Sequence, residues 1–358
     1  MMDTRAWTAF MELVRCGVAD TAPAQELFVG LTAADWEAIY TLARRQTVCG
    51  ICYAAYCRLP GSLLPGAPLL PRWVARVNAI ETANSRMGAA VGSLVTSFRS
   101  ARLHPVVQKG LSVARYYPAP ELRECGDIDL WFGPREMGAA LDIVRRSGAP
   151  VKTHPDGSRS FVSHGFTVEL HPRLINLSAP RARRRLEALV RSYAGSTGRG
   201  DLPSPSPLLE LLLIDVHIMR HAFGTGIGLR QICDYMLASA ALAGRYSRDE
   251  FARACADLGI ARWTVLLNAF AISYLGADAG VLPPSGYAGR RPLPVGALMK
   301  IVAEGGNFGL HRHAGSARRA GGKLHTVGML LRRSRMALSI APAEAFWNIV
   351  RLTGGQLK

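Results

Sequence analysis

Three stretches near the start of the chain carry apolar residues at intervals of three and four. They run from Trp7 to Val18, from Ala33 to Leu59 and from Pro71 to Leu103. This spacing places apolar side chains on one side of an α-helix. Prolines and glycines between residues 59 and 68 separate the second helix from the third. The pattern predicts an N-terminal helical region over residues 1–103, whose helices pack on the next segment and help frame a substrate pocket.

From residue 104 the pattern changes to short apolar strands that alternate with short helices. Strands are predicted at 105–109, 127–132, 150–154, 158–164 and 166–171, and helices at 110–117 and 134–147. Pro134 suits the first turn of the second helix, and Gly148 suits its end. Residues 104–175 are therefore predicted to form a small mixed β-sheet, the catalytic core of an α+β protein.

The rest of the chain, residues 176–358, is predicted to be helical with a basic tail. A helix from Leu208 to Phe223 follows a Ser-Pro-rich loop, and a second is expected at about 325–338. On the first of these helices Glu210, His217 and His221 share one stripe, because offsets of seven and four return to the same face. The stripe is interpreted as ordinary packing, with the lining of an active cleft as the alternative.

Two aspartates in the second predicted strand are the first sign of chemistry. Asp127 and Asp129 project to the same side, while Ile128 and Leu130 turn into the core. Adjacent carboxylates repel each other unless a cation lies between them, and hard cations such as Mg2+ prefer oxygen ligands. Gly110, at the start of a predicted helix, offers backbone N–H groups to a phosphate. Together these features predict a site for a metal ion and a triphosphate.

A third carboxylate comes from the last predicted strand. Its apolar residues face one side, whereas Thr167, Glu169 and His171 face the other. Glu169 is therefore expected beside Asp127 and Asp129 as the third metal ligand, and His171 is interpreted as capping the strand end or positioning a substrate. Three carboxylates that hold two metal ions suit phosphoryl transfer.

These motifs resemble an uncharacterised family of nucleotidyltransferases in the DNA-polymerase-β-like superfamily. The resemblance spans roughly residues 25–350 and rests on four motifs, Lys109-Gly110, Arg123-x-x-x-Asp127-Ile128-Asp129-Leu130, Val168-Glu169-Leu170-His171 and Gly228-Leu229-Arg230-Gln231-Ile232-Cys233-Asp234-Tyr235, with Gly306-Asn307-Phe308-Gly309 as a further candidate. It implies a polymerase-β-like core in which Gly110 is the helix-start glycine, Asp127 and Asp129 are the metal pair and Glu169 is the third acid. Leu111 stands where many members of the superfamily have serine, and Ser112 comes one residue later.

The resemblance also implies a reaction. We expect a nucleoside triphosphate such as ATP to donate its nucleotidyl group to an acceptor hydroxyl, with Mg2+ or Mn2+ as cofactor and pyrophosphate as product. The acceptor is a small molecule, a peptide or a protein, with RNA as a further possibility. The nucleotide-binding residues are expected to be Lys109, Gly110, Ser112, Arg123 and Arg230. Arg230 and Asp234 are four apart and are expected to pair along a helix.

The net charge of the chain indicates an alternative function. The 43 basic residues against 26 acidic ones give a net charge of +17, which favours a polyanionic partner. A basic nucleic-acid-binding protein, or a nucleotide-binding module without catalysis, is therefore the alternative. Neither a secretion signal nor a transmembrane span is visible, so a cytoplasmic location without membrane contact is expected. Cys49-x-x-Cys52 is interpreted as helix packing, because no second Cys or His pair lies at zinc-site spacing.

Overall fold

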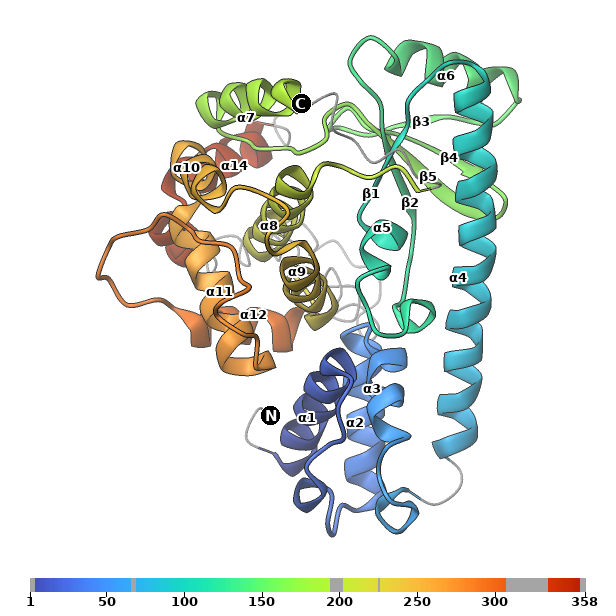
Figure 1. The fold of residues 1–358 in the computed structure, drawn as a ribbon, viewed down its shortest axis with the longest axis vertical. Helices are drawn as coiled ribbons and strands as arrows, with labels where there is room; N and C mark the ends of the chain where they lie inside the picture. The colour runs from blue at the N-terminus through green and yellow to red at the C-terminus, as the bar shows by residue number, and fades with distance from the viewer. Residues whose placement is uncertain (1–3, 66–68, 194–201, 225, 307–333, 355–358) are drawn as a thin grey trace.

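The computed structural model in Figure 1 describes residues 4–65, 69–193, 202–224, 226–306 and 334–354. The longest helix, α4 (Leu69–Ser100), runs along one side of the molecule. Trp73, Val77 and Ile80 in its first half pack with the N-terminal helices, whereas residues from Met87 to Phe98 pack against the sheet. Helix α4 therefore joins the N-terminal helices to the sheet.

The N-terminal helices are α1 (Arg5–Ala19), α2 (Ala33–Arg45) and α3 (Cys49–Tyr56). The prediction of one helix from Ala33 to Leu59 was wrong, because Thr47 adopts a positive φ of 54° that ends the first segment. Cys49 and Cys52 lie fully buried as free thiols, as the packing interpretation requires.

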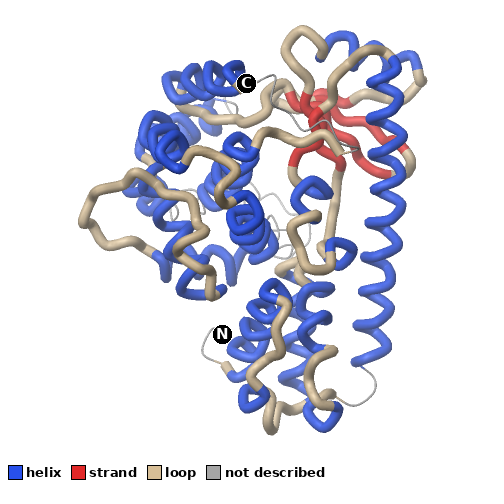
Figure 2. Tube along the Cα trace, in the orientation of Figure 1, coloured by secondary structure: helices blue, strands red, loops and turns tan. Residues whose placement is uncertain are grey.

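The sheet contains β1 (Val106–Gln108), β2 (Ile128–Trp131), β3 (Lys152–Thr153), β4 (Arg159–Ser163) and β5 (Phe166–His171). Their order is β1-β2-β5-β4-β3, and β2 and β5 are parallel, while the other neighbours are antiparallel. The strands gather beside the second half of α4 (Figure 2). The prediction of a mixed sheet with strands in these places is confirmed.

One face of the sheet is apolar and covered by helices. Ile128, Leu130, Val168 and Leu170 pack there against α4 and against α6 (Met137–Arg146). Two predicted helices are shorter than expected: α5 covers Gly110–Ala114 only, and α6 begins after a turn that contains Pro134. The opposite face, which carries the polar side chains, remains open toward the C-terminal helices.

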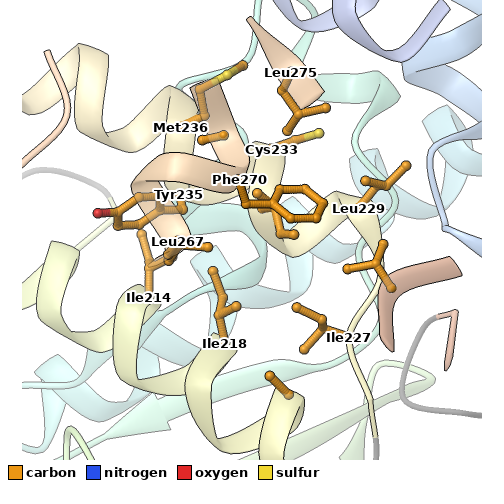
Figure 3. Close-up of a cluster of buried hydrophobic side chains, with 14 of the residues drawn as sticks. Ile214, Ile218, Ile227, Leu229, Cys233, Tyr235, Met236, Leu267, Phe270 and Leu275 are labelled. Atoms are coloured by element: carbon orange, nitrogen blue, oxygen red, sulfur yellow. The ribbon is translucent and has the colours of Figure 1, made fainter. Parts of the chain in front are cut away.

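The C-terminal region is helical, as predicted. Its helices are α7 (Pro180–Ser192), α8 (Pro207–Phe223), α9 (Leu229–Leu242), α10 (Arg248–Leu258), α11 (Ala261–Leu275), α12 (Val295–Gly305) and α14 (Pro342–Gly354). Figure 3 shows that α8, α9 and α11 meet in an apolar cluster that includes Ile218, Tyr235 and Phe270. Because this cluster fixes α8, the other side of α8 is held toward the sheet. Of the helix expected at 325–338, residues 325–333 lie outside the described part of the chain, and 334–340 are helical.

Short 3-10 turns lie between several helices, namely η1 (Gln25–Leu27), η2 (Gly61–Leu63) and η3 (Pro120–Leu122). Within the described ranges, no helix is both long and apolar enough to cross a membrane.

Candidate functional site

A cavity of about 400 Å³ lies between the polar face of the sheet and helices α8 and α9. Its charged and polar lining includes Gln108, Lys109, Asp127, Asp129, Glu169, His171, His217, Arg220, His221, Arg230 and Asp234. The N-terminal helices contribute none of the described residues that line this cavity, and their expected part in framing an acceptor pocket stays a prediction. The sheet and its adjoining loops supply most of the acidic groups, and α8 supplies two imidazoles and a guanidinium.

Strand register brings the predicted acids together. Asp129 on β2 lies directly opposite Glu169 on the parallel neighbour β5, and opposite Gln108 on the antiparallel neighbour β1. Side chains in register share one face of a sheet, so these three form a polar row across three strands. The prediction that Glu169 sits beside Asp129 on a neighbouring strand is confirmed.

Asp129 contacts two basic side chains of the site. Its Oδ2 lies 3.2 Å from Lys109 Nζ, and its Oδ1 accepts a hydrogen bond from His171 Nε2 at 2.5 Å. Burial alone would raise the pKa of this carboxyl, but the ammonium and the imidazole outweigh burial and hold the pKa well below its usual range. Asp129 is therefore ionised at neutral pH.

Asp129, Glu169 and His171 form a candidate metal-ligand set. One ligand atom from each lies within 4.8 Å of the other two, and His171 Nε2 is 3.7 Å from Glu169 Oε2. Ligands of one Mg2+ ion lie about 2.1 Å from it, so opposite ligands are about 4 Å apart and small side-chain adjustments suffice. Two carboxylates with one imidazole suit Mn2+ as well, since imidazole is a softer ligand than water or carboxylate.

Asp127 lies just before β2 and is more exposed than Asp129. The negative charge of Asp129 raises the pKa of Asp127, burial adds to the rise, and Lys109 opposes it. The pKa values of the two aspartates are therefore pushed apart, as expected for neighbouring carboxylates. A cation bound between them would relieve this repulsion.

The Lys109-Gly110 segment adopts an unusual backbone. Lys109 has φ 47° and Gly110 has φ 45°, in the left-handed region that side chains disfavour. A Cβ atom at position 110 would lie 3.5 Å from the backbone oxygen of Asp127, so the glycine is required by its φ rather than by crowding. The turn connects β1 to α5, and Lys109 next to it reaches Asp129. Strained non-glycine residues of this kind occur preferentially at functional sites.

Three predicted nucleotide-binding residues have protein contacts of their own. Ser112 is fully buried, outside the described lining, and its hydroxyl donates to Glu210 Oε1 at 3.0 Å. Arg123 was expected to bind the nucleotide, but it is 4% exposed and forms an ion pair with Asp234. Arg230 donates to the carbonyl oxygen of Glu124. The expected ion pair of Asp234 with Arg230 is replaced by the pair with Arg123.

Helix α8 forms the wall opposite the sheet. His217 and His221 line the cavity with ring centroids 4.4 Å apart, as the cleft-lining alternative proposed. Burial, reinforced by the charge of Lys109, lowers the pKa of His221 to about 3 and that of His217 well below its usual value. Glu210 does not line the cavity, and its carboxylate accepts hydrogen bonds from Arg115, Tyr116 and Ser112 instead. The α8 wall therefore presents neutral imidazoles next to Arg220.

Two polar groups of the site were not predicted as metal ligands or as nucleotide-binding residues. His171 was interpreted as a cap or as a residue that positions a substrate, and its spacing of two from Glu169 places both on one face of β5. Gln108 precedes Lys109 in a strand of only three residues, too short to show its alternation clearly. Each becomes recognisable once the partner strand is known.

Comparison with known protein families gives a match. No curated protein and no solved structure matches the chain significantly. The profile of a family described as uncharacterised nucleotidyltransferase matches residues 32–276, a segment that contains the whole sheet, the acidic row and helices α8 and α9. Because this match covers more than half of the chain, the protein belongs to this nucleotidyltransferase family.

Proposed function

We propose that the protein is a Mg2+-dependent nucleotidyltransferase with a polymerase-β-like core. The acceptor hydroxyl oxygen forms a bond to the α-phosphorus of a nucleoside triphosphate, the bond from that phosphorus to the β-phosphate oxygen breaks, and pyrophosphate leaves. The observation that carries this proposal is the row of Asp129 and Glu169 in register, with His171 and Asp127 beside it in one cavity. Family membership supports the same reaction class.

The chain's own residues have distinct roles in this proposal. Asp129, Glu169 and Asp127 hold the divalent cation, with His171 as a ligand or as the hydrogen-bond donor that orients Asp129. When bound, this cation neutralises phosphate charge and polarises the acceptor. Lys109 is released from Asp129 to contact a phosphate, and Gly110 lets the backbone turn beside it. The Glu169 carboxylate also accepts the proton of the acceptor hydroxyl.

Positive charge around the cavity favours the triphosphate. Lys109 and Arg220 line it, and Arg123 and Arg230 lie in the wall formed with α9. An arginine fork matches phosphate geometry, but Arg123 is already engaged by Asp234. In this proposal Arg123 therefore acts at a distance through its charge, and Ser112 supports α5 through Glu210 rather than through a direct phosphate contact.

The second candidate is metal-independent binding of a nucleic acid. It is favoured by the net charge of +17 and by the arginines of α7, of which Arg181, Arg184 and Arg185 are exposed. Such binding depends steeply on salt and does not require the acids of the cavity.

Calorimetry with each of the four nucleoside triphosphates, with and without Mg2+, tests both functions. The comparison includes wild type, the Asp127→Asn/Asp129→Asn double variant, and Asp142→Asn, which removes an exposed carboxylate of α6. We expect Mg2+-dependent binding in wild type and in Asp142→Asn, and its loss in the double variant. Binding of no triphosphate by wild type would reject the proposed function, and salt-sensitive RNA or DNA binding that all three proteins retain would favour the second candidate.

A further inference from the structure

Gln108 is the last residue of β1 and faces the cavity. It is 2% exposed, and its strand partner across the antiparallel pair is Asp129. Directly opposite residues of such a pair have their Cβ atoms about 5 Å apart on the same side of the sheet. The amide of Gln108 is therefore a neighbour of the candidate metal ligands.

The amide nitrogen of Gln108 has no hydrogen-bond partner among the described residues, although it is buried. Buried donors are almost always paired, and an unpaired one is costly. Gln46 shows the ordinary case, since it is 1% exposed but its Nε2 donates to the Val302 carbonyl at 2.9 Å and its Oε1 accepts from Leu229 N at 2.8 Å. Gln46 connects protein segments, whereas the Gln108 donor is unused by the protein.

The missing partner is a hydrogen-bond acceptor, because Nε2 can only donate. Gln108 lines the cavity with the small part of its surface that is exposed, and the terminal torsion of glutamine is broad, so rotation turns the amide toward a bound ligand. The nearest ligand oxygens in the proposed reaction are those of phosphates bound at Asp129.

We propose that the Gln108 side chain binds the nucleotide by donating a hydrogen bond from Nε2 to a nonbridging phosphate oxygen of the metal-bound nucleoside triphosphate. This inference rests on the proposed function and adds a contact that neither the motifs nor the candidate metal ligands contain. Gln108 binds substrate without contributing to the metal sphere.

The test replaces each buried glutamine by methionine, which has similar volume and cannot donate. Gln108→Met, Gln46→Met and wild type are compared by thermal unfolding without ligand, and by calorimetry with Mg2+ alone, with each Mg2+–nucleoside triphosphate and with each nucleoside. We expect Gln108→Met to unfold no earlier than wild type, to bind Mg2+ as wild type does, and to bind the triphosphate about tenfold or more weakly. Gln46→Met should unfold earlier.

Four results would overturn the inference. Unchanged triphosphate affinity in Gln108→Met would show that Gln108 does not contact the phosphates, and would leave the proposed function intact. If Gln108→Met unfolds at a lower temperature than wild type, as expected for Gln46→Met, the Gln108 amide stabilises the fold instead of binding the nucleotide. An equal loss of affinity for the nucleoside, which has no phosphates, would show that Gln108 contacts the base or the sugar. Failure of wild type to bind any Mg2+–nucleoside triphosphate would reject the proposed function and the inference with it.

Discussion

Arg123 and Asp234 form a two-point ion pair inside the protein, with Nε–Oδ1 2.9 Å and Nη2–Oδ2 2.6 Å. Only 4% of the Arg123 side chain and 8% of the Asp234 side chain are exposed. Tyr117 donates a further hydrogen bond to Asp234 Oδ1 at 2.7 Å. Because Arg123 precedes β2 and Asp234 lies on α9, the pair fixes the segment that leads into the acidic row against the helical wall of the cavity.

Substitution of Arg123 should therefore act first on stability. We expect Arg123→Met to lower the free energy of unfolding by roughly 3 to 5 kcal/mol, because it leaves the Asp234 carboxylate buried without its cation. Urea denaturation of wild type and variant measures this change.

The exposed ion pair of Arg145 and Asp142 is the control, with side chains 63% and 60% exposed. Arg145→Met should cost no more than about 1 kcal/mol. A loss in Arg123→Met as small as that in Arg145→Met would contradict the role of the buried pair.

The two aspartates of the site should respond differently to acid. Because Asp129 and burial raise the pKa of Asp127, this side chain protonates at a higher pH than an ordinary aspartate, while Asp129 stays ionised. Affinity for Mg2+–nucleoside triphosphate should fall as the pH drops through the Asp127 transition. Calorimetry from pH 8 to pH 4 follows the fall.

In Asp127→Asn this acid-dependent phase should be absent, and affinity at pH 8 should already be lower by about tenfold or more, since one charged ligand is missing. An unchanged pH dependence in the variant would assign the transition to another group.

The two histidines of α8 should remain uncharged at neutral pH. Burial lowers the pKa of His221 to about 3 and that of His217 well below its usual value, with the charge of Lys109 adding to both shifts. NMR of the imidazole rings should show no titration of either residue between pH 5 and pH 8. In Lys109→Met both pKa values should rise, although burial should keep them below the ordinary value. A wild-type transition near pH 6.5 would contradict this arrangement.

Asp215, which does not line the cavity, should make the free energy of unfolding depend on pH. It is fully buried on α8, burial raises its pKa to about 7, and Thr264 Oγ1 donates to its Oδ2 at 2.6 Å. The pKa of Asp215 in the folded protein lies above the ordinary value of 3.8. Its contribution to the free energy of unfolding is therefore fully present below about pH 4 and is lost as the pH rises through 7.

The amide of Asp215→Asn carries no charge at any pH. We expect this variant to be more stable than wild type at pH 8 by roughly 2 kcal/mol or more, with a smaller advantage at pH 5, where the unfolded aspartate is still mostly ionised. Chemical denaturation at both values measures the difference, and Asp142→Asn, which changes an exposed carboxylate, should show none. Equal destabilisation of Asp215→Asn at both pH values would indicate a hydrogen-bond effect instead.

Local periodicity and motif chemistry were sufficient to predict most helices and strands and the face on which each acid lies. Alternation placed Ile128 and Leu130 in the core and Asp129 on the opposite face, and it put Glu169 on a strand of the same sheet. The apolar period of α8 predicted its bounds to within one residue. These features depend on neighbours close in sequence, which a one-dimensional pattern contains.

The pairing of charged and polar side chains from distant segments became visible in the folded structure alone. Asp234 pairs with Arg123, 111 positions away, rather than with Arg230 one turn along its own helix, and Ser112 turns to Glu210 rather than to the cavity. The break at Thr47 and the short α5 likewise differ from what the local pattern predicts. His171 and Gln108 join the site through strand register. Such contacts depend on how distant segments pack, because burial makes each charge and donor take whichever group the fold brings within reach.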